Sequence, residues 1–374
     1  MRCDTVVIGG GVIGLSIAWE LARAGRDVRL IDPEPASGAT YAAAGMITPI
    51  SEHRPTEQSL HVIAQESAAR YPAFLATIPG GGRCGFEAVS TLLLAVDDAD
   101  RRSIDDLSAL QPGAIEPLTL REARRLEPLL GPRTTAVRRV REHRIDPRAL
   151  ATALLAALGD RIVRTVVRGI LHEDPNDPMS PAIGVRLDDA VITAREVVVA
   201  NGLAAGRLDG MPFVPTLRPV YGDILRLGVP DRLRPLLDCT VRARVHGASV
   251  YLLPRIDGTV VLGATQREHG GPAASAGGVY ELLRDAAAVV PAVAELELLE
   301  VTARARPTTP DNAPLLGRAA PGLIIATGFG RHGVMLAPIA AEAVASLISG
   351  VAPTGIAPFR PDRFTASPIP LEVS

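Results

Sequence analysis

A glycine-rich turn near the start of the chain most constrains what the sequence can fold into. An apolar run of β-type residues stops at Gly9, Gly11 and Gly14, spaced as G-x-G-x-x-G, and a helical run follows at once. A second apolar run ends at Asp32, eighteen residues after Gly14. In such strand–turn–helix units the glycines permit a tight turn, close approach of a pyrophosphate and close helix–strand packing. The pattern therefore predicts a dinucleotide-binding α/β unit.

The two ends of this unit have complementary polar chemistry. The helix start offers unpaired N–H groups to phosphates, and Asp32 can accept hydrogen bonds from the two ribose hydroxyls of an adenosine. A carboxylate there would repel a 2′-phosphate, which argues against NADP. The alternative interpretation is a generic α/β turn whose glycines only make room.

A second glycine turn stands near the other end of the chain. A buried-strand pattern at residues 323–326 meets a turn at 328–333 and leads into an apolar helix predicted over 334–348. The middle of the chain is β-rich, so we predict an α/β fold in which a Rossmann-like domain is interleaved with an inserted α+β domain built on an antiparallel sheet. The predicted boundaries are 1–85, 146–216 and 303–362 for the dinucleotide domain, 86–145 and 217–302 for the substrate domain, and 363–374 for a tail.

Hydrophobic periodicity and turn residues predict the remaining elements. Asp146 before Pro147 has the residue types of a helix start. Residues 97–102, rich in Asp and Arg, are predicted as a charged turn. Helices are predicted over residues 60–75, 120–126, 148–158 and 279–289, and strands over 89–96, 161–170, 182–187, 196–200, 217–227, 250–253 and 260–265.

Composition excludes several classes of function. The chain contains no lysine, which rules out a lysine Schiff base or nucleophile, and its formal net charge of −2 gives no electrostatic case for nucleic acid. Three distant cysteines, Cys3, Cys84 and Cys239, indicate neither a disulfide framework nor a metal site. We expect no bound metal, no signal peptide, no membrane span and a cytoplasmic setting.

Six segments together resemble the D-amino-acid-oxidase family of FAD enzymes, and two of them are most similar to its glycine oxidases of thiamine biosynthesis. The resemblance covers nearly the whole chain and implies FAD, held non-covalently because no cysteine or histidine stands at an evident covalent link. The segments are Gly9 to Asp32, Ala42-Ala43-Ala44-Gly45-Met46, Tyr251-Leu252-Leu253-Pro254-Arg255, Gly263-Ala264-Thr265, Arg306-Pro307-Thr308-Thr309-Pro310-Asp311 and Thr327 to Pro338.

The resemblance also implies a set of cofactor contacts. Val12 and Ile13 would lie at the pyrophosphate, Asp32 at the ribose, Val167 at the adenine, and the second glycine turn around the pyrimidine end of the flavin. A helix N-terminus there would stabilise negative charge on the reduced flavin, although strand–turn–helix units also occur for packing alone. The full implied set is Gly9, Gly11, Val12, Ile13, Gly14, Asp32, Pro33, Ala39, Thr40, Ala44, Gly45, Met46, Val167, Gly202, Arg306, Gly328, Phe329, Gly330, Arg331, His332, Gly333, Val334 and Met335.

Two arginines are the candidates for binding substrate. Arg306 precedes a proline turn, and a guanidinium can clamp an amino-acid carboxylate with two parallel hydrogen bonds. From position alone a surface ion pair would be the better interpretation of Arg306 and Arg331, and the motif match reverses that preference. Tyr251 could donate its hydroxyl to the same carboxylate, and Gln266 could border the pocket. His246 and His332 could border it too, but for Gln266 and both histidines a structural or surface role is the preferred interpretation.

The implied activity is oxidation of glycine to iminoacetate and glyoxylate, with ammonia and hydrogen peroxide formed and molecular oxygen as acceptor. A hydride would pass from the α-carbon to the flavin, so no catalytic acid–base residue is predicted. Gly330 leaves space near the ring and Gln266 makes a wall polar, which leaves open a D-amino-acid or N-methyl-amino-acid oxidase or dehydrogenase. A flavin-binding subunit without turnover also stays open, as do a homo-oligomer and transfer of product to a thiazole synthase.

Overall fold

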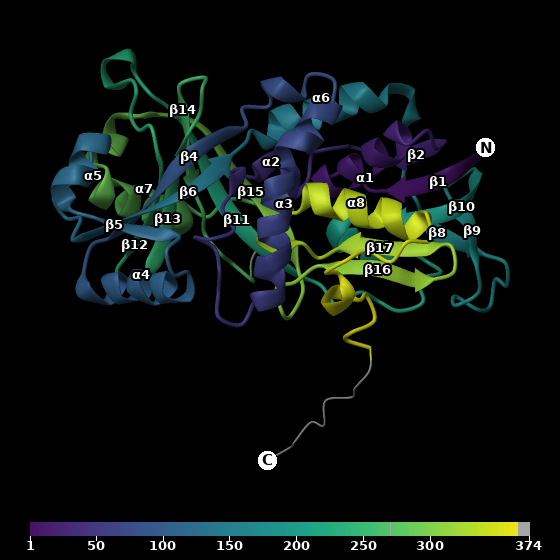
Figure 1. Cartoon of the computed structure of the whole chain (residues 1–374). Helices are drawn as coiled ribbons and strands as arrows, with labels where there is room; N and C mark the ends of the chain where they lie inside the picture. The colour runs from purple at the N-terminus through teal and green to yellow at the C-terminus, as the bar shows by residue number, and fades with distance from the viewer. Residues whose placement is uncertain (270, 366–374) are drawn as a thin grey trace. The chain divides into compact units, whose positions relative to one another are not determined.

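The computed structural model describes residues 1–269 and 271–365, and these divide into two compact units (Figure 1). The first unit comprises residues 1–37, 154–219 and 306–365 of the described chain, and the second comprises residues 38–153 and 220–305. Each unit is assembled from segments far apart in the sequence. The interleaving expected from the two glycine turns is therefore present.

The first unit is built on an eight-stranded sheet whose central strands are parallel. β1 (Arg2–Ile8) lies between β10 (Val191–Val199) and β2 (Val28–Ile31), and β17 (Leu323–Thr327) lies beside β10, all four running in the same direction. The outer members are β16 (Leu315–Ala320), β7 (Ile162–Val163), β8 (Gly169–His172) and β9 (Ala182–Arg186). The carboxyl-terminal parts of β1 and β10, at residues 6–8 and 197–199, and residues 323–326 of β17 are apolar runs because they are buried on both faces.

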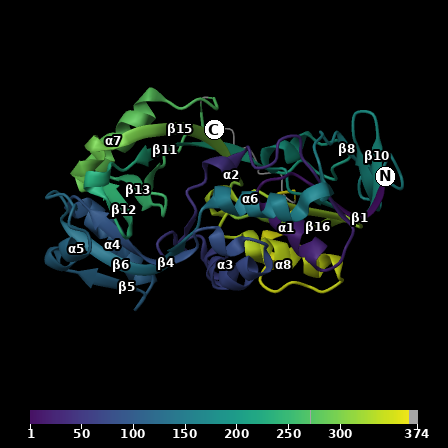
Figure 2. The ribbon, with the colours of Figure 1, turned by 90° about the horizontal axis from the view of Figure 1, so that it is seen from above.

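Two helices of this unit pack against each other. α1 (Val12–Arg23) follows the first glycine turn, and α8 (Ala337–Ile348) follows the second; the two lie side by side in both views (Figures 1 and 2). Small residues at the N-terminal end of α8, such as Ala337, Ala340 and Ala341, are buried there. Both helices therefore begin near strands that end at a glycine turn.

The second unit is built on a nine-stranded, mostly antiparallel sheet with α7 (Ala276–Val289) on one face and α4 (Asp98–Leu110) on the other (Figure 2). Its main order is β15 (Glu297–Thr308), β11 (Arg218–Gly228), β14 (Thr259–Gly263), β13 (Ala248–Pro254), β12 (Thr240–Val245), β4 (Glu87–Ala95), β6 (Ala136–Arg144) and β3 (Met46–Ile47), with β5 (Ile115–Leu118) paired to β6. Three further helices belong to it: α2 (Ala39–Ala42), α3 (Gln58–Thr77) and α5 (Leu120–Leu126).

Three sequence predictions of secondary structure were wrong in part. The charged turn at 97–102 is instead the start of helix α4, because Asp97 caps it by accepting a hydrogen bond from the Asp100 N–H and Ile104 packs into the core. The single strand predicted over 161–170 is two short strands, β7 and β8. The helix predicted from residue 334 begins at Ala337, after a 3-10 turn at Gly330–His332.

The domain limits given above differ from the compact units by three residues at 217–219 and at 303–305, and by longer stretches at two places. Residues 38–85 and 146–153 were assigned to the dinucleotide domain, and by their contacts they group with the second unit. The functional assignment of these stretches therefore stays a prediction. Of the expected tail, residues 366–374 lie outside the described residues.

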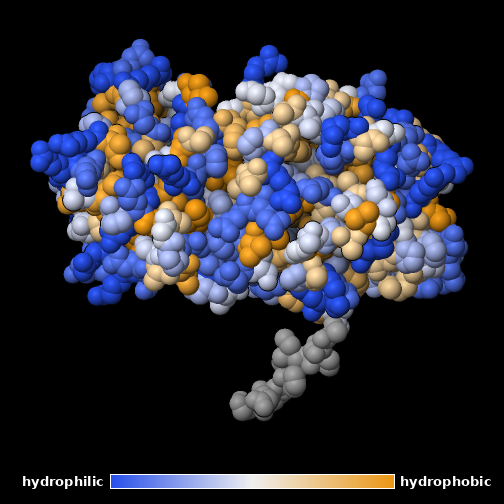
Figure 3. Space-filling model, viewed as in Figure 1, coloured by the Kyte–Doolittle hydropathy of each residue, from blue (hydrophilic) through white to orange (hydrophobic). Residues whose placement is uncertain are grey.

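The face of the molecule in Figure 3 carries hydrophilic and hydrophobic residues interspersed. Surface arginines pair with carboxylates, as Arg168 does with Asp188 at 2.6 Å and Arg232 with Glu295 at 2.8 Å. Among the helices of the described ranges, none combines the length and apolar character needed to cross a bilayer.

Candidate cofactor and substrate sites

The first glycine turn is closed so tightly that side chains would not fit. A Cβ on Gly14 would lie 1.9 Å from the Gly9 carbonyl oxygen, and a Cβ on Gly9 would lie 2.5 Å from the Asn201 Cα. Gly9 also has φ +104°, which favours glycine. Because Gly11 is the N-cap of α1, the turn brings the end of β1 directly to a helix N-terminus. The predicted anion-binding geometry is therefore present.

Asp32 lies at the end of β2 and is bound to this turn. Its Oδ2 accepts a hydrogen bond from the Gly10 N–H at 2.6 Å, and its Oδ1 accepts one from the Glu34 N–H at 2.8 Å. The Asp32 N–H donates to the Val163 carbonyl at 3.2 Å. Val167, four residues further along, is buried, whereas Pro33 is exposed. Each carboxylate oxygen keeps a second lone pair, so a ribose hydroxyl could still bind here.

The carboxyl ends of β10 and β17 complete the same edge of the sheet. The Thr327 hydroxyl donates to the Gly202 carbonyl at 3.1 Å, and a Cβ on Gly202 would be 3.6 Å from the Pro307 Cγ. The Asn201 Oδ1 is buried without a hydrogen-bond partner in the described structure. Ligands of open α/β sheets bind at the carboxyl ends of the strands. These residues therefore fit a dinucleotide with a polar group near Asn201.

The second glycine turn runs beside the end of strand β15. The backbones of Thr308 and Phe329 form a β-bridge, and a Cβ on Gly330 would be 3.4 Å from the Thr308 hydroxyl oxygen. Gly328 and Gly330 have φ +74° and +52°. The chain then makes one 3-10 turn, in which His332 is buried, before α8 begins. Residues 328–335 thus form a compact turn ahead of the helix, in place of the helical first turn expected there.

Arg306 and Arg331 are brought into neighbouring segments by this pairing. Arg306 precedes Thr308 by two residues and Arg331 follows Phe329 by two, on either side of the bridge. Both side chains are partly buried. The structure therefore places the two predicted substrate arginines in one unit, beside the glycine turn, and their roles stay predictions.

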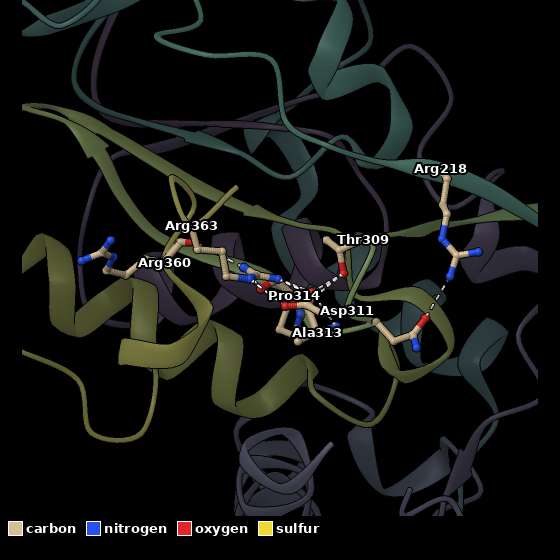
Figure 4. A network of polar contacts seen from close by, with 8 residues as sticks. Arg218, Thr309, Asp311, Ala313, Pro314, Arg360 and Arg363 are labelled. Carbon is tan, nitrogen blue, oxygen red and sulfur yellow. Dashed lines mark hydrogen bonds and ion pairs between the residues drawn. The ribbon is translucent and has the colours of Figure 1, made fainter. Parts of the chain in front are cut away.

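An ion-pair network fixes the turn that follows Arg306 (Figure 4). Asp311 accepts hydrogen bonds from Arg363 at 2.8 and 2.9 Å and from the Thr309 hydroxyl at 2.9 Å. Arg363 also donates to the carbonyls of Ala313 and Pro314, both at 2.9 Å. Burial raises the pKa of Asp311, but the bonds from Arg363 outweigh it and hold the pKa below its usual value. The turn is therefore held rigidly at neutral pH.

In the second unit, the small-residue segment packs on the sheet. Ala42 and Ala44 form a buried cluster with Leu253, and Met46 and Tyr251 pack against it. Thr40 is buried and Ala39 is partly exposed in the short helix α2. The segment predicted to line the flavin therefore lies on the sheet face that carries Tyr251, opposite the face covered by α7.

The loop after Gly263 carries Gln266, which is exposed. This loop is anchored beside it, because Arg267 donates to the fully buried Asp223 carboxylate at 2.8 and 3.2 Å. The Thr265 hydroxyl donates to Asp223 as well, at 2.9 Å. Gln266 is thus an exposed residue between two residues that hydrogen-bond to Asp223. Its contact with the substrate stays a prediction.

Arg242 is a residue of this face that sequence reasoning missed. It is the cross-strand neighbour of Tyr251; its Nη1 lies 2.7 Å from Glu52 Oε1 and 3.7 Å from the Met46 sulfur. Nearby Glu142 is buried, which raises its pKa, although it accepts two N–H bonds and the Ser51 hydroxyl. The alternation of Val241, Arg242 and Ala243 could have indicated a strand with arginine on its polar face.

His246 has the structural role that was preferred for it. It lies at the turn between β12 and β13, where its Nδ1 is 3.1 Å from Asp97 Oδ2. Its N–H donates to Asp100 Oδ2 at 2.9 Å. His246 therefore ties the hairpin tip to α4.

Comparison with known proteins agrees with this geometry. The family model described as "FAD dependent oxidoreductase" matches residues 4–347. The glycine oxidase of Geobacillus kaustophilus is 31% identical over 359 residues, covering 93% of each chain. The crystal structure of a glycine oxidase from the same species superimposes with a TM-score of 0.86 at 28% identity, covering 97% of this chain and 99% of that one.

A longer relative matches as well. The bifunctional protein ThiO/ThiG of a Nostoc species is 29% identical over 357 residues, which cover 93% of this chain and 53% of the relative. The chain therefore spans about half the length of this relative.

Proposed function

Because the chain belongs to the family of FAD-dependent oxidoreductases, we propose that it is a glycine oxidase that oxidises glycine or another small amino acid. The observation that carries the proposal is the pairing of Thr308 with Phe329, which sets Arg306 beside the second glycine turn. The likeness to glycine oxidases over more than nine-tenths of both chains supports the choice of substrate.

The cofactor is FAD, and the glycine cradle at Gly9 and Gly14 suits its pyrophosphate. When bound, FAD supplies the acceptor for the hydride that leaves the substrate α-carbon. Asp32 and the N-terminus of α1 would hold the adenosine diphosphate part. Ala44, Gly45 and Met46 would contact the ring. FAD is proposed to be non-covalent.

The chain's own residues would then bind and orient the amino acid. Arg306 would clamp its carboxylate with two parallel hydrogen bonds, and Arg331 would add positive charge. Tyr251 would donate its hydroxyl to the substrate. With the carboxylate held, the amine must enter unprotonated, and no side chain is needed as a general base. The imino acid is released, and water converts it to the oxo acid and ammonia.

The proposal extends to the compartment, the electron acceptor and the partners of the enzyme. Cys3, Cys84 and Cys239 are buried thiols that form no disulfide, which supports a reducing compartment such as the cytoplasm. Molecular oxygen would reoxidise the flavin and give hydrogen peroxide. A homo-oligomeric state and transfer of the imine to a thiazole synthase belong to the same proposal. The half-length match to a bifunctional relative supports the second.

Anaerobic reduction of the purified yellow protein tests the proposal. Glycine, sarcosine, D-alanine and D-proline are added separately, and flavin absorbance near the visible maximum is followed. Bleaching by glycine supports the proposal. Bleaching by the larger amines alone would assign the D-amino-acid or N-methyl-amino-acid activity instead, and no bleaching by any amine would indicate a flavin-binding subunit without turnover.

A further inference from the structure

Two histidines of the second unit are stacked beside the C-terminal end of α4. His53 lies in the loop of residues 48–57 between β3 and α3, and His61 lies on the first turn of α3. Their ring centroids are 4.0 Å apart, with 18° between the ring planes. Gln111, the C-cap of α4, reaches both rings: its Nε2 is 2.6 Å from His53 Nδ1 and 3.0 Å from His61 Nε2. One side-chain amide therefore joins α4 to the loop and to α3.

The partners of these atoms indicate where the hydrogens lie. His61 Nδ1 is 3.1 Å from the Pro49 carbonyl oxygen, which can only accept, so this nitrogen carries the hydrogen and His61 Nε2 keeps a lone pair. The amide nitrogen of Gln111 has two hydrogens, one for each ring nitrogen that faces it. His53 then carries its hydrogen on Nε2, which is buried without a hydrogen-bond partner among the described residues. This arrangement requires both rings to be neutral.

A proton on His61 is unfavourable in this arrangement. Burial lowers the pKa of His61 below its usual value of 6.5, the His53 ring lowers it further, and the bond to Pro49 offsets part of the shift. A proton at His61 Nε2 would put an N–H against the N–H of Gln111 and would bury a charge. Because the pKa is lower in the folded protein, the unfolded or open chain takes up the proton more readily. The stability that His61 contributes is therefore present above pH 6.5 and is lost as the pH falls below that value.

Other ionisable groups of the surrounding elements are distinguishable from His61. Buried Glu142 of β6 accepts the Ile50 and Ser51 N–H groups at 3.1 and 2.8 Å, and burial raises its pKa. A raised carboxyl pKa makes the folded state bind a proton more readily, so this titration has the opposite sign. The remaining groups of the loop, α3, β6 and the C-terminal half of α4 are paired, stacked or exposed: Glu52 with Arg242, Arg54 with Glu57, Glu66 with Arg70, Asp105 with Arg138, Arg139 with Glu116, Arg144 with Glu87, His143 on Phe86, and exposed Asp106 and Arg141.

We propose that His53, His61 and Gln111 form a proton-sensitive clasp, which holds the 48–57 loop and the start of α3 to the end of α4 at neutral pH and opens in weak acid. Ile104 keeps α4 on the apolar cluster of the sheet, so opening loosens the loop and leaves the helix in place. The same loop carries Glu52, which lies 2.7 Å from Arg242. The clasp therefore controls a loop that supplies the partner of a sheet arginine, and the inference depends on neither cofactor nor substrate.

Hydrogen–deuterium exchange, read by mass spectrometry near pH 7.5 and pH 5.5, tests the clasp. Each rate is divided by the intrinsic exchange rate at that pH, so that protection is compared. The informative amides include His53, which donates to the Ile50 carbonyl at 3.3 Å, and Gln111, which donates to the Ser108 carbonyl at 3.2 Å. One pH unit below 6.5 an accessible histidine is protonated about ten times more often than not. We therefore expect protection of residues 48–57 and 108–114 to be about tenfold lower near pH 5.5.

Two variants identify the groups responsible. Gln111→Met, which keeps the length of the side chain without its polar atoms, should lower protection of the loop about fivefold or more near pH 7.5. His61→Phe keeps a ring in the stack and should reduce the pH effect to under about threefold. His269→Gln is the matched control, because His269 is an exposed histidine of the same unit, and this variant should keep the full pH effect of the parent.

Three results would overturn the inference. Equal protection of the parent at both pH values would show that the Gln111 amide reverses and that its oxygen accepts from the protonated ring. Parent-like protection of Gln111→Met near pH 7.5 would show that the amide does not hold the loop. A tenfold pH effect retained in His61→Phe would assign the titration to another group. If either variant does not fold, the comparison of the parent with itself at the two pH values still decides.

Discussion

The Tyr251 hydroxyl occupies the space that a side chain at Gly263 would need: a Cβ there would lie 2.3 Å from the Tyr251 Oη and 2.6 Å from its Cζ. The two residues are paired across β13 and β14. The Tyr251 ring can lie in this position only because residue 263 has no side chain. This explains why a glycine begins the Gly263-Ala264-Thr265 segment.

Gly263→Ala should therefore displace the Tyr251 ring and weaken substrate binding. Losing one hydrogen bond to a charged carboxylate costs about 1.5–3 kcal/mol, so KM for the amino acid should rise roughly ten- to a hundredfold, with FAD affinity unchanged. Gly277→Ala is the control, because a Cβ on this exposed helical glycine meets nothing within 4 Å. A parent-like KM for Gly263→Ala would remove Tyr251 from the proposed role.

Gly14→Ala should abolish cofactor retention. Its Cβ would lie 1.9 Å from the Gly9 carbonyl oxygen, a backbone atom that cannot move without opening the turn. We expect FAD binding at least about tenfold weaker, measured as flavin retained after gel filtration, with far-UV circular dichroism reporting the fold. Gly206→Ala, where the nearest atom is the Val214 Cγ1 at 3.5 Å, should retain FAD. Full retention by Gly14→Ala would contradict the pyrophosphate assignment.

Arg306→Ala should remove the proposed carboxylate clamp. Leaving the substrate carboxylate without its partner should cost about 3–5 kcal/mol, or roughly a hundred- to several-thousand-fold in kcat/KM. Arg168→Ala, which breaks an exposed pair with Asp188, should leave kcat/KM within about twofold. Steady-state peroxide formation with glycine measures both. A loss of less than about fivefold would exclude Arg306 from carboxylate binding.

The Arg148–Glu300 pair should make stability depend on acid pH. Arg148 donates to both Glu300 oxygens, at 2.6 and 3.0 Å, and lowers the pKa of Glu300 from 4.5 to about 2. A depressed carboxyl pKa contributes stability that is present above pH 4.5 and is lost as pH falls toward 2. Glu300→Gln should lower the urea midpoint at pH 7, and the gap from the parent should shrink by about half or more between pH 5 and pH 3.

Glu116→Gln is the control for that titration. Glu116 pairs with Arg139 at 2.6 Å, but its side chain is 56% exposed, and exposed pairs contribute little. The urea midpoint of this variant should follow the parent at every pH. A gap for Glu300→Gln that stays constant from pH 7 to pH 3 would show that the carboxyl is not the titrating group.

The sequence predicted the first unit well because its signals are local. The second apolar run, which ends at Asp32, is strand β2, Val28–Ile31. The same holds in the second unit, where Asp146 caps the helix at Pro147 by accepting hydrogen bonds from the Arg148 and Ala149 N–H groups. Glycine spacing, apolar runs and cap residues act within a few positions of one another. Such features are visible without knowing what the chain packs against.

What the sequence did not predict depends on distant partners. The start of helix α4 was predicted as a charged turn because the helix contains many Asp and Arg residues. Ile104, its buried residue, gives too weak an apolar signal against them. Strand β12 alternates arginine with small apolar residues, and its inward face is defined only by β4 and β13. Arg255 was visible as part of a segment, but its bond to Ala44, 211 positions away, comes from tertiary folding. Composition gives no measure of such pairings.

Asp311→Asn should loosen the turn that follows Arg306 in the network of Figure 4. The neutral amide would weaken two charged hydrogen bonds from Arg363, at 2.8 and 2.9 Å, and charged bonds contribute about 1.5–3 kcal/mol. At 2–4 °C per kcal/mol for a domain of 150–250 residues, Tm should fall by roughly 3–12 °C. KM for glycine should rise with kcat nearly unchanged, because the turn follows Arg306, which is proposed to bind the substrate carboxylate equally in the ground state and the transition state. Arg360→Ala is the control, because it removes an exposed pair with Asp362 and should shift neither Tm nor KM. An Asp311→Asn protein with parent-like Tm and KM would show that the turn is held by its backbone alone.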